Sequence, residues 1–544
     1  MVKRVWGKAG ISILILVTII SFTLPAERDQ DVDKSLELFG SIFREVNSIY
    51  VADIDPNSLI EASIKSMLKS LDPYTSYIPQ EKIEDFNAIT TGETRGIGAT
   101  IGVINGRNVI LSPIEGHSAY NNGLRRGDEI IEINGEVVTA QADISRLIKN
   151  PDKEEIVLKI KRYGEQEYFD KILKVEKIKT RNVSYYGKIT DEIGYIKLVE
   201  FTAGAAEEVR HAVLELKSKK VKKFILDLRD NPGGLLNEAV GVSNVFLPKG
   251  QVVLNIKGKS SRWNKTYRTY NHPVDTVSPL IVLTNENSAS AAEIVAGVMQ
   301  DYDRGVLVGQ KTFGKGLVQA TVPVSKDTKL KITTAKFYIP SGRYIQSTEY
   351  AHLKNNKEDD HTFYTKNKRE MKNGTGIIPD FILDKTKKSD LVKELESKGL
   401  IFDYASAYYF NHSSKFINPK QFVVDDLEYE NFIQWIDSQN FKYTTDMEKS
   451  LAYFTNVSKS EQLYPDITAE LESIQAKLKK VKSTRFDVYK NDIKQVLSEE
   501  IAARYYLTGK IESSLNEDDH IKRATAIFGN MKKYDSSLKP SKNN

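Results

Sequence analysis

The sequence contains no cysteine among its 544 residues. Disulfides, thiolate zinc sites, iron–sulfur clusters and a cysteine nucleophile are therefore excluded. The seven histidines lie far apart and form no HExxH-type pair, so we do not expect a metal site. The 78 basic and 73 acidic residues leave a formal charge of +5. This charge is too small for the length to indicate a nucleic-acid partner.

What the sequence does contain is the composition of a large folded protein. Hydrophobic residues make up 40% and aromatic residues 9% of the chain. That is enough apolar material to bury several cores, so wholesale disorder is excluded. At roughly 100–200 residues per domain, the length predicts about three or four domains.

The N-terminus has the pattern of an export signal. Lys3, Arg4 and Lys8 precede an uncharged stretch over 9–26, which includes the apolar run Ile11–Ile20. This order is typical of a signal peptide or a membrane anchor, and the uncharged stretch just reaches spanning length. We expect residues 1–26 to direct export to the periplasm, either cleaved or retained as an inner-membrane anchor. A buried N-terminal helix is the alternative.

Four further segments differ in patterning, and together they predict an α/β, multidomain protein. Apolar residues at helical spacing predict a helical region over 31–90, and short β-runs between glycines predict a β domain over 91–179. Strands alternate with helices over 183–385, where the apolar runs Phe224–Leu228 and Leu280–Leu283 predict buried strands. Polar residues at about 350–373 predict a solvated insertion within this core. Residues 386–544 are charged, poor in glycine and predicted to be all helical.

The β domain contains two glycine-rich strings. Gly96-Ile97-Gly98-Ala99 is followed by Gly123-Leu-Arg-Arg-Gly-Asp-Glu-Ile-Ile-Glu-Ile-Asn-Gly135, which ends in a hairpin-type Asn-Gly turn. Together they resemble a PDZ domain. The resemblance implies that a peptide adds as a strand, and that the loop formed by Gly96, Ile97, Gly98 and Ala99 presents backbone N–H groups to its terminal carboxylate. A small β domain without a ligand is the alternative.

A serine-rich turn follows the strand predicted at Leu280–Leu283. Asn287-Ser-Ala-Ser-Ala-Ala-Glu-Ile294 leads into a predicted helix. A serine there lies at the positive end of the helix dipole, beside unpaired N–H groups. Ser288 or Ser290 is therefore either a helix cap or a nucleophile, and this segment alone does not separate the two.

A lysine and a glutamine follow in the same region. Lys315 lies between Gly314 and Gly316, where the surrounding sequence has a buried pattern. Burial would lower the pKa of the lysine, and a neutral amine can take the proton of a serine hydroxyl. Gln319 falls four residues later, on the same side of an extended segment, where it can orient Lys315 without adding a charge. A solvated lysine in a glycine turn is the alternative.

Both segments together resemble the two signature motifs of the carboxyl-terminal processing peptidases, or tail-specific proteases. Three further strings agree and occur in order: Leu71–Tyr77, Asp227–Gly234, and Tyr338–Gln346 with Gly376–Asp380. The resemblance implies a crotonase/ClpP-like protease core in which Ser290 is the nucleophile, Lys315 the base and Gln319 its partner. It also implies an oxyanion hole formed by Gly233 or Gly234 and the N–H of Ala291. Asn287 and Ala292 stand where the family often has glycine and serine.

The resemblance implies a serine endopeptidase that cleaves exported or membrane proteins near their C-termini without metal or cofactor. Its expected partners are proteins or peptides with free C-termini, whose tails the PDZ domain binds. The C-terminal helical domain is expected to serve an adaptor protein or self-association, and the N-terminal segment to associate with a membrane.

Two other classes of protein share parts of this pattern. A catalytically silent PDZ scaffold on a protease-like fold would have lost the nucleophile or the base, whereas Ser290, Lys315 and Gln319 are all present. An acyl-CoA enzyme of the crotonase type has a similar core. The PDZ-like module and the export signal argue against a cytosolic CoA substrate.

Overall fold

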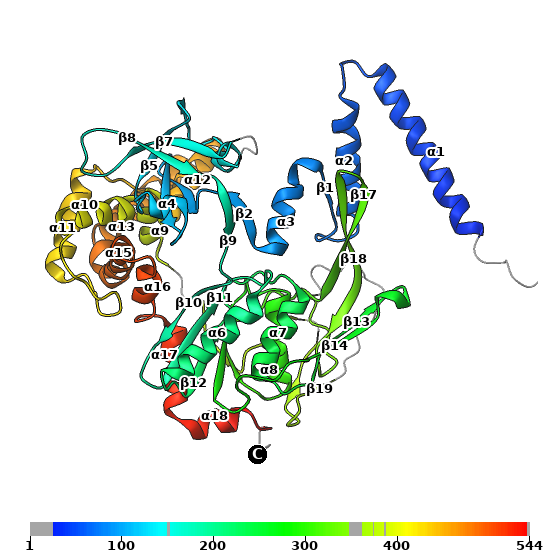
Figure 1. Ribbon diagram of the computed structural model, residues 1–544. Helices are drawn as coiled ribbons and strands as arrows, with labels where there is room; N and C mark the ends of the chain where they lie inside the picture. Colours follow the sequence, from blue (N-terminus) through cyan, green and yellow to red (C-terminus); the bar gives the residue numbers. More distant parts are fainter. Residues whose placement is uncertain (1–25, 150–152, 348–361, 374, 386–387, 541–544) are drawn as a thin grey trace, which may run out of the picture. The chain divides into compact units, whose positions relative to one another are not determined.

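The computed structural model describes residues 26–149, 153–347, 362–373, 375–385 and 388–540 (Figure 1). The chain divides into two compact units, residues 1–77 and 78–544. All but the last residue of the expected export segment, 1–26, lies outside the described residues. Within the described ranges, no helix is both long enough and apolar enough to cross a membrane.

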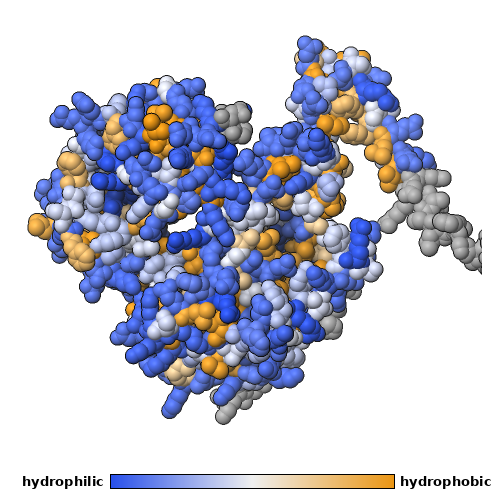
Figure 2. All heavy atoms as spheres, viewed as in Figure 1, coloured by the Kyte–Doolittle hydropathy of each residue, from blue (hydrophilic) through white to orange (hydrophobic). Residues whose placement is uncertain are grey.

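The first unit contains the helices α1 (Ala26–Ile49) and α2 (Pro56–Lys69) and the first two residues of strand β1 (Ser76–Ile78). The helical periodicity predicted for this region is confirmed in both helices. Asp55 caps α2 by accepting hydrogen bonds from two first-turn N–H groups, and Pro56 occupies the first turn, where no N–H is needed. The apolar side chains of α1 are exposed, and Figure 2 shows them gathered along the helix.

The second unit begins with α3 (Ile83–Thr91) and the β domain. Strands β2 (Glu93–Gly96) and β9 (Glu176–Lys179) pair with each other at its base. Its main sheet has the order β3-β4-β5-β7-β8, with β6 paired to β5. The elements are β3 (Ala99–Ile104), β4 (Arg107–Pro113), α4 (Ser118–Asn121), β5 (Glu129–Ile133), β6 (Glu136–Val137), α5 (Ile144–Ile148), β7 (Glu155–Lys161) and β8 (Phe169–Lys174). Strand β3 is at an edge of this sheet, so one side of its backbone is open to another strand.

A six-stranded sheet forms the centre of the protease-like region, with the order β10-β11-β12-β15-β16-β21. Its strands β11, β12, β15, β16 and β21 are parallel, and β10 pairs antiparallel with β11 at one edge. The predicted buried strands are confirmed as β12 and β15. The strands are β10 (Val183–Lys188), β11 (Ile193–Leu198), β12 (Lys223–Asp227), β15 (Leu280–Thr284), β16 (Val306–Gly309) and β21 (Phe381–Ile382).

Helices cover both faces of this sheet (Figure 1). Alternate strand residues, such as Leu226 and Val282, pack against α6 (Ala205–Ser218), α7 (Leu236–Phe246) and α8 (Ala291–Asp301). Their neighbours Ile225 and Ile281 face the opposite side, where they pack against Phe528 and other apolar residues near the C-terminus. Successive side chains of a strand point to opposite faces of the sheet. The continuous apolar runs of β12 and β15 therefore require both faces of the sheet to be covered.

That second cover comes from α17 (Asp519–Gly529) and α18 (Met531–Ser537). Tyr534 is buried, and its hydroxyl is hydrogen-bonded to the backbone N–H and carbonyl of Leu280 on β15. The sequence predicted a C-terminal helical domain over 386–544. The structure adds that the last helices of this segment complete the core of the preceding one.

A second sheet contains the antiparallel strands β17 (Leu317–Ser325), β18 (Thr328–Tyr338), β13 (Val252–Gly258) and β14 (Lys265–Arg268). A short hairpin, β19 (Phe363–Tyr364) and β20 (Glu370–Met371), lies in the segment predicted to be a solvated insertion. Most described residues of that segment are exposed, and the buried Arg369 is an exception. Arg369 is buried, and its guanidinium bonds the carboxylates of Asp303 and Asp380 at 2.6 and 2.5 Å. A charge-dense stretch can thus be anchored when each buried charge finds a partner.

Four of the remaining helices form a bundle around an apolar cluster: α9 (Asp390–Ser397), α10 (Leu400–Asn411), α11 (Asp426–Ser438) and α15 (Lys490–Tyr505). The others are α12 (Asp446–Ser460), α13 (Tyr464–Ser483), α14 (Arg485–Val488) and α16 (Gly509–Ser514). All eight confirm the predicted helical character of this region. The bundle contacts the β domain through ion pairs. Arg126, from the second glycine-rich string, pairs with the buried Glu500 on α15 at 2.8 Å, and Arg107 pairs with Asp403 at 2.7 Å.

Candidate active site

Ser290 is the residue immediately before α8, at the end of the turn that leaves β15. Its backbone has φ +54°, a conformation that costs a non-glycine residue about 1–3 kcal/mol. A strained turn between a strand and a helix projects its residue away from both elements, as in the nucleophile elbow of α/β-hydrolases. Ser290 also lies at the positive end of α8, where developing negative charge is stabilised.

The other serine of the turn, Ser288, has a different environment. It is fully buried, and its hydroxyl donates to the carbonyl of Leu228 at 2.8 Å while accepting from the N–H of Asn285 at 2.9 Å. These bonds fasten the turn to the residue following β12. The geometry therefore gives Ser288 a structural role and leaves Ser290 as the stronger nucleophile candidate.

The loop that follows β12 lies directly against the serine turn. A Cβ atom added to Gly233 would lie 2.8 Å from Ser290 Cβ and 2.9 Å from the nitrogen of Ala291. Gly234 packs elsewhere, because its added Cβ would lie 2.4 Å from the carbonyl oxygen of Phe201. Of the two predicted glycines, Gly233 is thus the one in contact with the serine turn and with Ala291.

The side chain of Asn231 shapes this loop. It is fully buried, its amide donates to the carbonyl of Leu198, and its Oδ1 accepts from the N–H of Gly233 at 2.8 Å. Its own carbonyl accepts from the N–H of Ala289 at 2.9 Å. An oxyanion bound at Gly233 would therefore have to share or replace the bond to Asn231.

Asp230 adds a polar link that the sequence did not indicate. Its carboxylate accepts from the side-chain amides of Asn285 and Asn287, both at 2.8 Å, and its N–H donates to Asn285 Oδ1. Asn287, one of the two departures from the usual family motif, thus helps to hold the two loops together. The only sequence signal for this link is the Asn-x-Asn pattern.

Arg229, the residue before Asp230, anchors the loop to the C-terminal helices. Arg229 pairs with Asp227 at 2.6 Å and with Asp518, the cap of α17, at 2.7 Å. Burial alone would raise the pKa of the Asp227 carboxyl, but Arg229 and Lys197 hold it well below its usual range. The predicted oxyanion loop is therefore fixed by residues almost 300 positions apart in the sequence.

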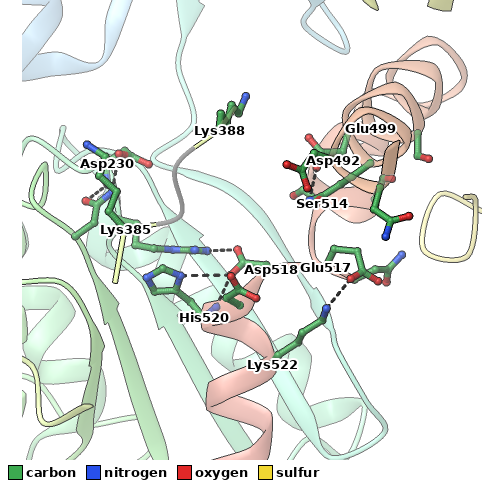
Figure 3. Close-up of a pocket in the computed structure, with 18 of the residues that line it drawn as sticks. Asp230, Lys385, Lys388, Asp492, Glu499, Ser514, Glu517, Asp518, His520 and Lys522 are labelled. Atoms are coloured by element: carbon green, nitrogen blue, oxygen red, sulfur yellow. Dashed lines mark hydrogen bonds and ion pairs between the residues drawn. The ribbon is translucent and has the colours of Figure 1, made fainter. Parts of the chain in front are cut away.

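A cavity of about 880 Å³ lies beside this anchor (Figure 3). Figure 3 shows Asp230 and Lys385 on one side of it, and Asp492, Glu499 and Ser514 on the other. None of the predicted catalytic residues is among the described residues that line it. Many of the charged side chains that line the cavity form ion pairs with each other. One such pair is Lys522 and Glu517, whose charged atoms lie 2.5 Å apart. The cavity is therefore not the site predicted from the sequence.

Lys315 lies in the loop between β16 and β17 and is half-buried. Its backbone N–H donates to Glu293 Oε2 at 2.8 Å, and the N–H of Ser290 donates to the same oxygen at 2.8 Å. The structure thus brings the two predicted catalytic segments to a single carboxylate. Sequence reasoning did not assign a role to Glu293, although it is the one charged residue in the first two turns of an otherwise apolar helix.

Glu293 is fully buried and its second oxygen is also occupied. Oε1 accepts from the hydroxyl of Thr312 at 2.6 Å and from the N–H of Gly314 at 2.7 Å. Burial raises the pKa of Glu293 to about 7, against the lowering effect of these four hydrogen bonds.

Gln319 is half-buried on β17, and its side-chain amide donates to the hydroxyl of Thr333 on β18 at 3.1 Å. The pairing of β17 with β18 shifts register between Val318 and Gln319. This bulge interrupts the alternation on which the sequence argument relied, so the orientation of Gln319 toward Lys315 stays a prediction.

The predicted carboxylate-binding loop joins β2 to β3 in the β domain. The carbonyls of Ile97 and Gly98 accept from Ala119 and Ile114, which fixes the loop over the rest of the domain. A cavity of about 420 Å³ runs from this loop along the edge strand β3 to α5, and its lining includes Ile101, Ile144 and Ile148. The groove therefore combines an open strand edge with an apolar floor.

Comparison with known proteins assigns the main regions. Family models match at residues 192–351 ("Peptidase family S41"), 109–162 ("PDZ domain") and 391–528 ("Probable PDZ-protease, C-terminal helical domain"). A "Carboxy-terminal-processing protease" of Bartonella bacilliformis is 35% identical over 350 residues, covering 63% of this chain and 80% of the relative. A "Probable CtpA-like serine protease" of Staphylococcus aureus is 32% identical over 345 residues, covering 62% and 68%.

Among solved structures, the chain is similar to a photosystem II D1 C-terminal processing protease. The identity is 24% and the TM-score 0.36, over 64% of this chain and 88% of that one. The matching family models and the described helices and sheets confirm the predicted fold class: a PDZ domain, an α/β protease core and a C-terminal helical region. With a relative more than 30% identical over four fifths of its length, the chain belongs to the carboxy-terminal-processing serine proteases of peptidase family S41.

Proposed function

We propose that this chain is an endopeptidase in which Ser290 is the nucleophile and Lys315 its general base. The single observation that carries the proposal is that the strained Ser290 and the loop of Lys315 hydrogen-bond to the same oxygen of Glu293. Two segments predicted independently from the sequence to cooperate are therefore neighbours.

The proposed reaction has two steps. The neutral amine of Lys315 takes the hydroxyl proton of Ser290 while the serine oxygen attacks the peptide carbonyl, and the ammonium returns that proton to the departing amine. Lys315 then takes a proton from a water molecule that attacks the serine ester, and the ammonium gives that proton to the departing Ser290 oxygen. N–H groups of Ala291 and of the Gly233–Gly234 loop would stabilise the tetrahedral oxyanion, and Gln319 would orient Lys315.

The test is peptide cleavage together with labelling by a fluorophosphonate. Ser290→Ala and Lys315→Ala should each lose cleavage and labelling while keeping the wild-type melting temperature. Lys311→Ala is the matched control, because Lys311 is an exposed lysine four residues before Lys315. Wild-type turnover in Ser290→Ala would disprove the assignment, and equal losses in the two lysine variants would remove Lys315 as the base.

We propose further that the PDZ domain captures the free C-terminus of the substrate. The open edge of β3 supports addition of a peptide strand, and the groove floor of Ile101, Ile144 and Ile148 suits an apolar tail. The loop Gly96–Ala99 would bind the terminal carboxylate. Substrates are therefore proteins or peptides with unblocked, apolar C-termini.

Two glycines of the same domain give a matched test. Gly98 has φ +75°, and an added Cβ would lie 2.2 Å from His117 Cβ, whereas Gly106 has φ +73° and nothing within 4 Å. The wild-type enzyme should cleave a peptide with a free C-terminus faster than its amide. Gly98→Ala should lose this preference and Gly106→Ala should keep it. Equal cleavage of acid and amide by the wild-type enzyme would show that the domain does not recognise the terminus.

The basic and apolar pattern of residues 1–26 supports export to the periplasm as part of this proposal. Cell fractionation of the native chain and of a Leu14→Asp variant tests it, since a charge in the apolar run should retain the protein in the cytoplasm. Equal distribution of the two would refute export through this segment.

A further inference from the structure

The carboxylate of Glu293 has an unusual set of partners. Three are backbone N–H groups, from Ser290, Gly314 and Lys315, and the fourth is the hydroxyl of Thr312. They come from two segments that are separated by more than 20 residues along the chain. Each carboxylate oxygen accepts two hydrogen bonds, so all four acceptor positions expected for an ionised carboxylate are occupied.

Every one of these partners acts as a donor. The Thr312 hydroxyl accepts from the N–H of Ile377 at 2.7 Å, so its single hydrogen is the one directed at Glu293. The site therefore requires a side chain with two acceptor oxygens and no hydrogen. A glutamine of the same length would turn an NH₂ group toward two of the donors, and an aspartate would be shorter by one methylene.

We propose that Glu293 is the positioning residue that holds the Ser290 turn and the Lys315 loop in register. The inference rests on the proposed roles of Ser290 and Lys315. The bond to the Ser290 N–H supports a backbone conformation that is otherwise unfavourable, at φ +54°. The bond to the Lys315 N–H fixes the residue that carries the base. One rigid acceptor thus sets the distance between two groups whose reaction depends on their relative placement.

The alternative is that Glu293 merely stabilises the fold, as many buried hydrogen-bonded carboxylates do. Asp301, at the other end of α8, provides the comparison. It is also a buried carboxylate, and it accepts from Arg343 at 2.5 Å and from the N–H of Ser341 at 2.8 Å. It lies about 12 Å from Glu293 along the helix axis. Loss of the Asp301 charge should lower the stability of the protein without changing the conformation of the serine turn.

The experiment measures kcat, binding of a free-C-terminus peptide and melting temperature in the full-length protein. Glu293→Gln should lower kcat about 100-fold, the effect of a misplacement near 1 Å, and leave peptide binding unchanged. Asp301→Asn should lower the melting temperature and leave kcat unchanged. Thr312→Val should lower kcat about tenfold through the loss of one donor, and Thr312→Ser, which keeps the hydroxyl, should retain it.

The inference is overturned if Glu293→Gln keeps wild-type kcat. It is also overturned if Asp301→Asn lowers both the melting temperature and kcat by the same amounts as Glu293→Gln. Should Glu293→Gln fail to fold, the two Thr312 variants decide, and equal kcat in both would overturn the inference. Cleavage retained by Ser290→Ala or Lys315→Ala would instead contradict the proposed function. Loss of cleavage in both of those, with full activity in Glu293→Gln, would contradict the role of Glu293 alone.

Discussion

Replacement of Gly233 by alanine tests the predicted oxyanion loop most directly. Gly233 has φ +98°, and an added methyl group would lie 2.7 Å from the carbonyl oxygen of Ala289 and 2.9 Å from the nitrogen of Ala291. Both atoms are backbone atoms of the serine turn, so neither can move without moving Ser290. The substitution therefore changes the loop at the place where an oxyanion would bind.

Two effects of different size are expected. The left-handed backbone alone costs an alanine roughly 1–2 kcal/mol of stability. Displacement of an oxyanion donor typically costs about 100- to 1000-fold in kcat. We therefore expect Gly233→Ala to reduce the free energy of unfolding modestly and kcat severely, with little change in KM.

Gly250→Ala separates these effects. Gly250 has φ +88° and nothing within 4 Å of an added Cβ, so the variant carries similar backbone strain without the collision. Urea denaturation should show a loss of about 1–2 kcal/mol, and peptide cleavage should proceed at the wild-type kcat. Wild-type kcat in Gly233→Ala would refute the reasoning, and so would an equal loss of kcat in Gly250→Ala.

Three further predictions concern other parts of the molecule. Phe528→Ala should destabilise the protein by about 3–5 kcal/mol in urea denaturation, because Phe528 is buried against the core sheet. Phe454 lies at an exposed helix position, so Phe454→Ala should change stability by less than about 0.5 kcal/mol. Burial raises the pKa of Glu500, but Arg126 and the other cations around it lower it to about 2 from its usual 4.5. The contribution of the Glu500 carboxylate to stability is therefore complete above pH 4.5 and is lost as the pH falls toward 2. Unfolding curves of wild type and Glu500→Gln should differ at neutral pH and converge on acidification, and a constant difference at all pH values would contradict the pairing. Thr333→Val should lower kcat by about fivefold through loss of the hydrogen bond to Gln319, while Thr333→Ser keeps the rate, and equal rates would show that this bond does not orient the glutamine.

Much of the fold could be predicted because its signals are local. The apolar runs Phe224–Leu228 and Leu280–Leu283 are too short for helices and lie between turns, and they are buried strands in the structure. The glycine-rich strings indicated the PDZ domain for the same reason. A tight turn imposes its residue types directly on the sequence.

The candidate site was predicted only in part. The motifs indicated Ser290, Lys315 and the Gly233–Gly234 pair from short segments. They did not distinguish Gly233 from Gly234 or anticipate that Asn231 would accept a hydrogen bond from the N–H of Gly233. The bulge before Gln319 was also not visible in the sequence, because a register shift depends on the partner strand.

The sequence by itself determined the elements and the residue types that they carry, since helical and strand periodicities and turn residues act over a few positions. Only the tertiary structure decided which elements meet. It joined the Ser290 turn to the Lys315 loop through Glu293, placed α17 and α18 on the open face of the core sheet, and buried Arg369 between Asp303 and Asp380. Each of these depends on residues distant in the chain that must satisfy a buried charge or cover an apolar face. Such a requirement arises only when the chain is packed, so it produces no periodic pattern in the sequence.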